Sequence, residues 1–398
     1  MVKVGAVRKT TIKHAARVLT LASLTLLGGC FGFGGGDEPT PDVLVTRQDL
    51  PPQQNFTTIG DGNVPVAMLL PLSAGGSASS LAQSFKNAAD LALRDVATDN
   101  IRVEIRDTAG ETDVAKLAAE QAIGSGAQLI LGPVFAEAVR GASEAARGAG
   151  VPMIAFSTDA GVAGRGTYLL SFLPKQDAAR IVSYAATQGM RTFAALVPNT
   201  NYGLVMEAAF REAVSASGGR VTTVERYAPG EIRAAAEAVS ARGAVQAVFV
   251  PNGGDDPSIA ASAFSTAGQT PKLLGSGQWA NRAVLAAPGL VGAWYPGPAP
   301  GGFAEFSQKY SAAFGAAPPR TASLVYDATL LANGLVGARG AQAFRPASLQ
   351  ASDGFLGVDG IFRLDRDGLS ERGLAVYEVA PGGESNVVSG APTQFSRS

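Results

Sequence analysis

The chain has almost no cysteine or histidine: its 398 residues include one of each, Cys30 and His14. A single cysteine excludes an internal disulfide, so the folded state must depend on the burial of apolar groups. Ser-His-Asp and Cys-His catalysis need an imidazole, and structural zinc sites need several Cys or His ligands. The motif S-x-x-K is absent, and SAGGSASS (73–80) matches neither phosphate-loop pattern. These absences favour binding over catalysis, and we expect a non-enzymatic protein without metal or cofactor.

Basic residues without acidic neighbours occupy the start of the chain, at Lys3, Arg8, Lys9, Lys13 and Arg17. An apolar segment over 18–27 follows, which is too short to span a bilayer as a helix but has the length of a signal-peptide core. LGGC (27–30) resembles a bacterial lipobox, in which the cysteine is acylated. We therefore predict a lipoprotein signal peptide over 1–29 and lipidation of Cys30. The alternative is an ordinary signal peptide with an incidental cysteine.

Removal of that segment leaves 27 basic and 33 acidic residues, a net charge of −6. This surface lacks the basic footprint that nucleic acid requires, so we expect no nucleic-acid partner and membrane contact through the lipid anchor alone. Phe31, in place of Asp, favours the outer membrane by resemblance to enterobacterial sorting. Residues 30–63 are rich in Gly, Pro and polar residues and predict a flexible linker. We expect the protein on the periplasmic side of the cell envelope.

Strand and helix patterns alternate from residue 64 onward. VPVAMLLPL (64–72) is a continuous apolar run, typical of a strand buried on both faces. SSLAQSFKNAADLALRDV (79–96) then places apolar residues at helical spacing. The same alternation restarts near residue 167, and GVDGIFRLDRDGLSERGLAVYEV (357–379) predicts a hairpin. The expected fold class is α/β, with two doubly wound lobes.

Several segments, in order along 64–379, resemble the type I periplasmic binding proteins of the leucine/isoleucine/valine-binding family. They are VAMLLPLSAGG, QLILGPVFAEAV, VPMIAFSTD, NYG, AVFVPNGGDDPSIAASAFSTAG and GVDGIFRLDRDG. The resemblance implies a three-crossing hinge, with crossings near Leu170, Gly277 and Arg345. It places lobe 1 at 64–170 plus 278–345, lobe 2 at 171–277 plus 346–380, and a polar tail at 381–398.

The resemblance also implies a ligand in the cleft at the carboxyl ends of the strands. Serine and threonine hydroxyls would contact the carboxylate of an amino-acid ligand, and Asp159 or Asp255 would contact its ammonium group. Tyr202 would form an aromatic wall. The predicted ligand-binding residues are Ser73, Gly75, Val134, Phe135, Ser157, Thr158, Asp159, Tyr202, Gly253 and Asp255. The alternative is structural: Ser73 and Thr158 would cap helices, and Tyr202 would fill the lobe interface. Val134 and Phe135 depart from the family, whose amino-acid binders often carry hydroxyls in this loop.

Two functions remain open at this stage. One is a lipid-anchored protein that binds an amino acid or similar small polar solute and delivers it to an ABC permease. The other is an outer-membrane lipoprotein that activates a peptidoglycan synthase, because the architecture also resembles lipoproteins of the penicillin-binding protein activator type. An enzyme on a Rossmann-like sheet is the least favoured alternative.

Overall fold

The computed structural model of the chain describes residues 56–395. The predicted signal peptide, Cys30 and most of the predicted linker lie outside the described residues. No helix within 56–395 combines the length and the hydropathy needed to cross a membrane.

The first lobe is built on a six-stranded sheet with the order β1-β3-β2-β4-β5-β6. Its strands are β1 (Thr57–Ile59), β2 (Val64–Leu70), β3 (Ile101–Asp107), β4 (Ile130–Leu131), β5 (Met153–Ala155) and β6 (Thr167–Leu169). All neighbours pair in parallel except β1, which is antiparallel to β3. The predicted doubly wound arrangement is therefore present in this lobe.

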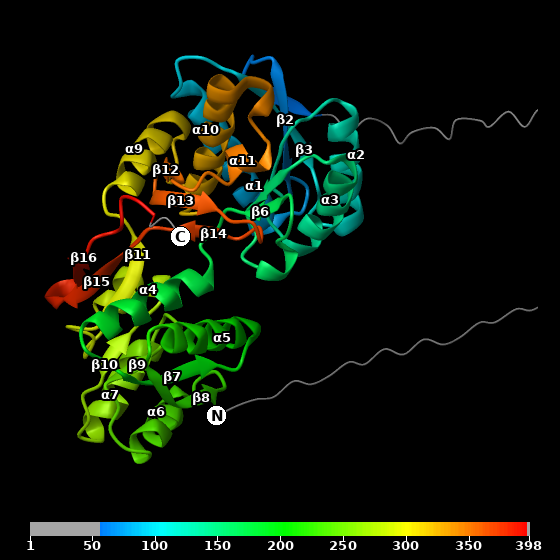
Figure 1. The fold of residues 1–398 in the computed structure, drawn as a ribbon. Helices are drawn as coiled ribbons and strands as arrows, with labels where there is room; N and C mark the ends of the chain where they lie inside the picture. The colour runs from blue at the N-terminus through cyan, green and yellow to red at the C-terminus, as the bar shows by residue number, and fades with distance from the viewer. Residues whose placement is uncertain (1–55, 396–398) are drawn as a thin grey trace, which may run out of the picture. The chain divides into compact units, whose positions relative to one another are not determined.

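Helices cover both faces of the first sheet (Figure 1). They are α1 (Gly76–Arg94), α2 (Thr112–Gly124), α3 (Ala136–Ala149), α9 (Gly302–Phe314), α10 (Ala322–Arg339) and the short α11 (Pro346–Leu349). Val66, Met68 and Leu70 of β2 pack with α1, α9 and α10, whereas Ala67 and Leu69 pack with α2 and α3. The apolar run of β2 is continuous because its alternate residues enter two different cores.

The second lobe is built on a seven-stranded sheet with the order β16-β15-β11-β10-β9-β7-β8. Its strands are β7 (Thr192–Pro198), β8 (Arg220–Tyr227), β9 (Ala247–Phe249), β10 (Lys272–Leu274), β11 (Trp294–Pro298), β15 (Leu374–Ala380) and β16 (Glu384–Ser389). One face packs on α4 (Pro174–Thr187) and α5 (Asn201–Ala216). The other packs on α6 (Ile232–Ala241), α7 (Asp256–Thr266) and α8 (Arg282–Leu285).

A third, antiparallel sheet consists of β12 (Phe355–Gly357), β13 (Gly360–Leu364) and β14 (Ser370–Arg372). Phe362 and Leu364 of β13 are buried in the core of the first lobe. Four single-turn 3-10 helices complete the described chain: η1 (Ala160–Val162), η2 (Gly277–Trp279), η3 (Gly340–Gln342) and η4 (Pro381–Gly383).

The chain passes between the lobes three times, but two predicted crossings are misplaced. The first lies between β6 and α4, at residues 170–173. The crossing predicted near Gly277 is wrong, because β10 pairs with β11 in the same sheet and the chain leaves only after Pro298. The crossing predicted near Arg345 is also wrong, because β12–β14 pack on the first lobe and the chain returns between Arg372 and Leu374.

Lobe 1 therefore consists of 57–170 and about 299–372, and lobe 2 of 174–298 and 374–389. The predicted hairpin is half right: β13 turns back into β14, but Leu374–Ala380 pairs with β11 and β16 in the other lobe.

Short strands occupy part of the predicted flexible linker and part of the predicted polar tail. The linker predicted to reach residue 63 stops before Thr57–Ile59, which pairs with β3. The tail predicted from 381 contains Glu384–Ser389, which pairs with β15. In both places a short polar strand covers the edge of a sheet whose unpaired backbone groups would otherwise be exposed.

Candidate ligand-binding cleft

A cavity of about 730 Å³ lies between the two lobes at the hinge. Its volume is in the range of sites for small organic molecules. The first lobe contributes Thr158, Phe303 and Arg320, and the second contributes Asp177, Tyr202 and Gln278. All three crossings also line it, through Phe172, Pro298 and Leu374. A molecule bound here would touch both lobes and the segments that join them.

Tyr202 presents its ring to the cavity while its hydroxyl is held inside the second lobe. It lies in the first turn of α5, which Thr200 caps by accepting a hydrogen bond from Gly203 N–H at 3.2 Å. The hydroxyl donates to the Pro251 carbonyl at 3.3 Å and lies 3.3 Å from Ser276 Oγ. Burial raises the pKa of Tyr202 to about 12. Tyr202 is thus a neutral aromatic wall with a fixed orientation.

The η2 turn positions Gln278 at the cavity. Ser276 caps the turn by accepting from Gln278 N–H at 3.1 Å, and its hydroxyl donates to the Pro251 carbonyl at 2.6 Å. The fully buried Trp279 anchors the turn because its Nε1 donates to the Val250 carbonyl at 3.0 Å. The Gln278 side chain accepts a hydrogen bond from Gly253 N–H at 3.1 Å. These contacts leave the Gln278 amide nitrogen available to a ligand.

Asp177 is the carboxyl group of the cavity lining. It is half-buried, lies in the first turn of α4, and accepts a hydrogen bond from Gly277 N–H at 2.8 Å. Removal from water raises the pKa of Asp177 to about 7, against the lowering effect of that hydrogen bond. At neutral pH this carboxyl group therefore carries only part of a negative charge.

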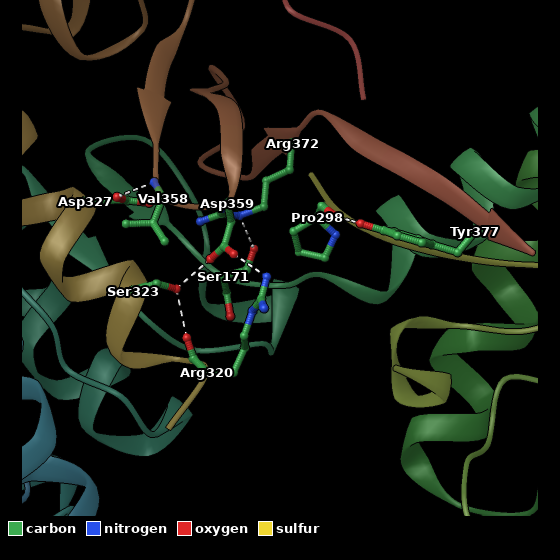
Figure 2. A network of polar contacts seen from close by, with 9 residues as sticks. All are labelled: Ser171, Pro298, Arg320, Ser323, Asp327, Val358, Asp359, Arg372 and Tyr377. Carbon is green, nitrogen blue, oxygen red and sulfur yellow. Dashed lines mark hydrogen bonds and ion pairs between the residues drawn. The ribbon is translucent and has the colours of Figure 1, made fainter. Parts of the chain in front are cut away.

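Arg320 is the cation of the cavity lining. It precedes α10, its side chain is 42% exposed, and its Nη2 pairs with the fully buried Asp359 (Figure 2). Asp359 also accepts a hydrogen bond from Ser323 Oγ at 2.6 Å. The guanidinium carbon lies 4.2 Å from the centre of the Phe303 ring. The Asp359 carboxylate is itself held by Ser323 of α10. Together with the Phe303 ring, it fixes the direction in which the Arg320 guanidinium points.

Two further buried charged groups lie behind Arg320. Arg372, at the end of β14, is 5% exposed, and its Nη1 and Nη2 have no hydrogen-bond partner among the described residues. Asp327 of α10 is 3% exposed and accepts from Val358 N–H at 2.8 Å through one oxygen, while the other has no partner in that range. Burial raises the pKa of Asp327 to about 7, against the lowering effects of Arg372 and of the Val358 N–H. Burial also lowers the pKa of Arg372.

Hydrogen bonds join the first crossing to the third and fix the start of the second (Figure 2). Arg372 Nε donates to the Ser171 carbonyl at 3.3 Å, which links the third crossing to the first. Tyr377 of β15 donates its hydroxyl to the Pro298 carbonyl at 2.6 Å, which links the second lobe to the start of the second crossing. These hydrogen bonds therefore lie at the hinge, beside the cavity that Pro298 lines.

Two of the ten predicted ligand-binding residues, Thr158 and Tyr202, line this cavity. Thr158 is exposed in the loop after β5. Gly253 contacts the lining only through Gln278, and Asp255 is exposed ahead of α7 without capping it.

The other predicted residues of the first lobe lie outside the lining, and most have structural partners. Ser157 is 4% exposed and its hydroxyl accepts from Asp159 N–H at 3.1 Å, so it closes a turn. The Asp159 carboxylate accepts from Gly161 N–H and pairs with Arg140 at 3.2 Å. The remaining predicted residues are Ser73, whose N–H donates to Asp107, the α1 N-cap Gly75, the half-buried Val134 and the exposed Phe135.

Sequence reasoning missed Arg320, Asp177 and the two phenylalanines of the cavity, Phe172 and Phe303. Phe172 lies in the first crossing and Asp177 follows it, so a search around that segment would have found them. Arg320 follows two prolines and precedes a helical segment. This local pattern predicts the start of a helix but does not predict a ligand-binding role.

A second cavity of about 670 Å³ lies beside α4 and the turn between β13 and β14. Its charged groups are largely paired: Arg180 donates to the Leu374 carbonyl and Ser389 Oγ, both at 2.6 Å, and Glu371 pairs with Arg363. No group of three or more potential metal-ligating side chains occurs within residues 56–395.

The profile of the family described as periplasmic binding protein matches residues 63–384. A branched-chain amino acid ABC transporter periplasmic ligand-binding protein from Burkholderia xenovorans is 18% identical, with a TM-score of 0.64, covering 84% of this chain and 94% of its own. A leucine-binding protein from Thermotoga maritima is 16% identical, with a TM-score of 0.56, covering 82% of this chain and 98% of its own. A solute-binding protein of an ABC transporter from R. palustris, solved with benzoate, is 18% identical, with a TM-score of 0.56, covering 84% of this chain and 98% of its own. A search of curated proteins finds no match.

At these identities the solved structures show a shared fold, and the family profile covers most of the chain. The predicted fold class and the predicted family resemblance are both confirmed. The chain belongs to the periplasmic binding protein family.

Proposed function

We propose that the protein is a non-enzymatic receptor that binds a small polar organic solute between its lobes and delivers it to an ABC permease. The observation that carries this proposal is the cavity of about 730 Å³, lined by both lobes and by all three crossings. A ligand that contacts both walls favours the closed arrangement of the lobes, and a permease can recognise that arrangement.

The solved structures described above are named as solute-binding or ligand-binding proteins of ABC transporters, or as a leucine-binding protein. This supports solute binding over activation of a peptidoglycan synthase. Amino acids are the solute class that the sequence resemblance implies. We also propose that Cys30 is acylated and holds the protein on the periplasmic side of the envelope, at the outer membrane. The lipobox resemblance of LGGC (27–30) supports this anchor.

The test is a thermal-shift screen of the full chain against amino acids, organic acids, amides and sugars, followed by small-angle X-ray scattering with any hit. A ligand at 100 times its Kd stabilises the folded state by about 2.7 kcal/mol, so the melting temperature should rise saturably. The radius of gyration should fall as the lobes close. If no solute produces a saturable shift, the receptor function is wrong.

A further inference from the structure

The charge of the cleft is unevenly divided between its walls. Among the described residues that line it, the charged side chains are Arg320 from the first lobe and Asp177 from the second. Arg320 is a permanent cation, since a guanidinium keeps its proton in proteins. Asp177 is only partly ionised at neutral pH, because removal from water raises its pKa to about 7. The cavity therefore offers a full positive charge and no full negative charge.

Arg320 keeps hydrogen-bonding capacity for a ligand. Within residues 56–395 its side-chain hydrogen bonds involve Nη2 alone, which pairs with Asp359. A guanidinium has five N–H donors on a planar fork, so Nε and Nη1 can still donate. Asp359 is fully buried and also accepts a hydrogen bond from Ser323, so its own position is fixed. It therefore holds the Arg320 guanidinium in place. An oxyanion that enters the cavity would meet an oriented donor.

The buried groups behind Arg320 add to the positive potential. Arg372 is buried with both terminal nitrogens unpartnered among the described residues, and Figure 2 draws it beside Asp359. The acidic groups near the two guanidinium groups are Asp359 and Asp327. Burial raises the pKa of Asp327 to about 7, so Asp327 is partly protonated. Two guanidinium groups and two carboxyl groups therefore share this buried cluster, and the raised pKa of Asp327 shifts its charge towards positive. The side chain of Arg320 is 42% exposed, so solvent screens part of its charge, whereas Arg372 is buried.

The described lining offers one acidic side chain, Asp177, to an ammonium group. The two aspartates that the sequence suggested for this role do not line the cavity: Asp255 is exposed at the start of α7, and Asp159 pairs with Arg140. Asp177 already accepts the Gly277 N–H at 2.8 Å, and its raised pKa leaves it only partly ionised at neutral pH. An α-amino acid would thus bury its positive charge against a weak partner.

The rest of the lining suits an apolar body. Phe172 from the first crossing and Phe303 from α9 lie on the side of Arg320, whose guanidinium carbon is 6.0 Å and 4.2 Å from the two ring centres. Tyr202 lines the cavity from the opposite lobe, with its hydroxyl turned to Pro251. Aromatic walls on both lobes can enclose a flat or branched apolar group when the lobes close.

We infer that the cleft binds a small organic carboxylate with an apolar body and no ammonium group, and that Arg320 pairs with its carboxylate. This inference rests on the proposed function and narrows its solute class. The ligand carboxylate takes the free N–H groups of Arg320, and the apolar body lies among Phe172, Phe303 and Tyr202. Asp359 is a positioning residue, because it acts on the ligand through Arg320.

The test uses matched ligand pairs with the full chain, measured by isothermal titration calorimetry at neutral pH in a buffer without carboxylates. Hydrocinnamate and L-phenylalanine differ by the ammonium group, as do isocaproate and L-leucine, and benzoate and benzamide differ by the charge. The carboxylates should bind at least 10-fold more tightly than their amino-acid or amide partners. Arg320→Gln should weaken carboxylate binding by about 10- to 100-fold.

Arg140→Gln is the matched control, because Arg140 is similarly exposed, pairs with acidic residues and does not line the cavity. It should leave binding unchanged. Arg320→Lys keeps the charge and loses the fork, so it should bind more tightly than Arg320→Gln and less tightly than the unmodified protein. If Arg320→Gln does not fold, Arg320→Lys and the ligand pairs still decide the matter.

Equal binding of carboxylate and amide, tighter binding of the amino acids, or full binding by Arg320→Gln would overturn the inference and leave the receptor function standing. If carboxylates, amides, amino acids and sugars all fail to bind, the proposed function falls together with the inference.

Discussion

Replacing Asp327 by asparagine should stabilise the protein at alkaline pH and leave it nearly unchanged at acidic pH. Asp327 is 3% exposed, and its unpartnered oxygen lies where a Cβ on Gly357 would come within 2.3 Å. Its other oxygen accepts from Val358 N–H at 2.8 Å, and an asparagine carbonyl can accept the same hydrogen bond. The substitution thus removes a buried charge and keeps the contact and the shape.

The sign follows from proton linkage. Burial raises the pKa of Asp327 from 3.8 to about 7, so the folded state holds this proton more tightly than the unfolded state does. Between these values the unfolded state has lost its proton and the folded state has not, so the free energy of unfolding falls as pH rises. Each pH unit of that interval corresponds to about 1.4 kcal/mol, which gives an upper limit of about 4 kcal/mol by pH 8.

Urea unfolding followed by circular dichroism at pH 4, 5, 6, 7 and 8 measures this effect. The advantage of Asp327→Asn over the unmodified protein should grow with pH and level off above pH 7, with equal m-values for the two proteins. Asp353→Asn serves as the control, because Asp353 is exposed, and should show no such growth. A pH-independent difference, or an Asp327→Asn protein that is less stable at pH 8, would mean that Asp327 is ionised and held by Arg372.

Four other substitutions test the packing and the anchor. Gly141→Ala should destabilise the protein by about 1–3 kcal/mol, because the new Cβ would lie 2.0 Å from the Thr112 carbonyl oxygen. Gly148→Ala on the same helix places its Cβ more than 4 Å from any neighbour and should stabilise the protein by about 0.5–1 kcal/mol. Equal effects of the two substitutions in urea unfolding would contradict this. Phe249→Ala, at a fully buried position, should cost about 3–5 kcal/mol by the same assay, and a loss below 1 kcal/mol would argue against the core as described. Cys30→Ala should leave the melting temperature unchanged but move the protein from the detergent phase to the aqueous phase, and persistent detergent partitioning would refute the lipid anchor.

The elements that sequence patterns predicted well are those whose signal is local. The run over Val64–Leu70 predicted a strand buried on both faces, and β2 divides its side chains between two cores. Strand β11 was missed because its sequence, WYPGP, carries a glycine and two prolines and indicates a turn. It is a strand because β10 and β15 flank it, and β15 begins at Leu374, far along the chain. The misplaced crossings follow from that single omission and from the unexpected sheet β12–β14.

The cleft was less predictable than the fold. Tyr202 could be placed from the NYG motif, since a residue in the first turn of a helix after a buried strand faces the carboxyl edge of the sheet. Arg320 had no such signal, because its orientation depends on Asp359, 39 residues later, and on the ring of Phe303. Pairings of this kind arise only when segments that are separate in the sequence have packed together in the first lobe.

The three crossings also decide when each lobe can be completed during synthesis. The core of the first lobe needs Phe362 and Leu364, and the sheet of the second lobe needs β15, which ends at Ala380. Almost the whole chain must therefore emerge from the ribosome before either lobe can close its core, so neither lobe can fold alone as an early unit. A chain with this connectivity stays largely unfolded until late in its synthesis.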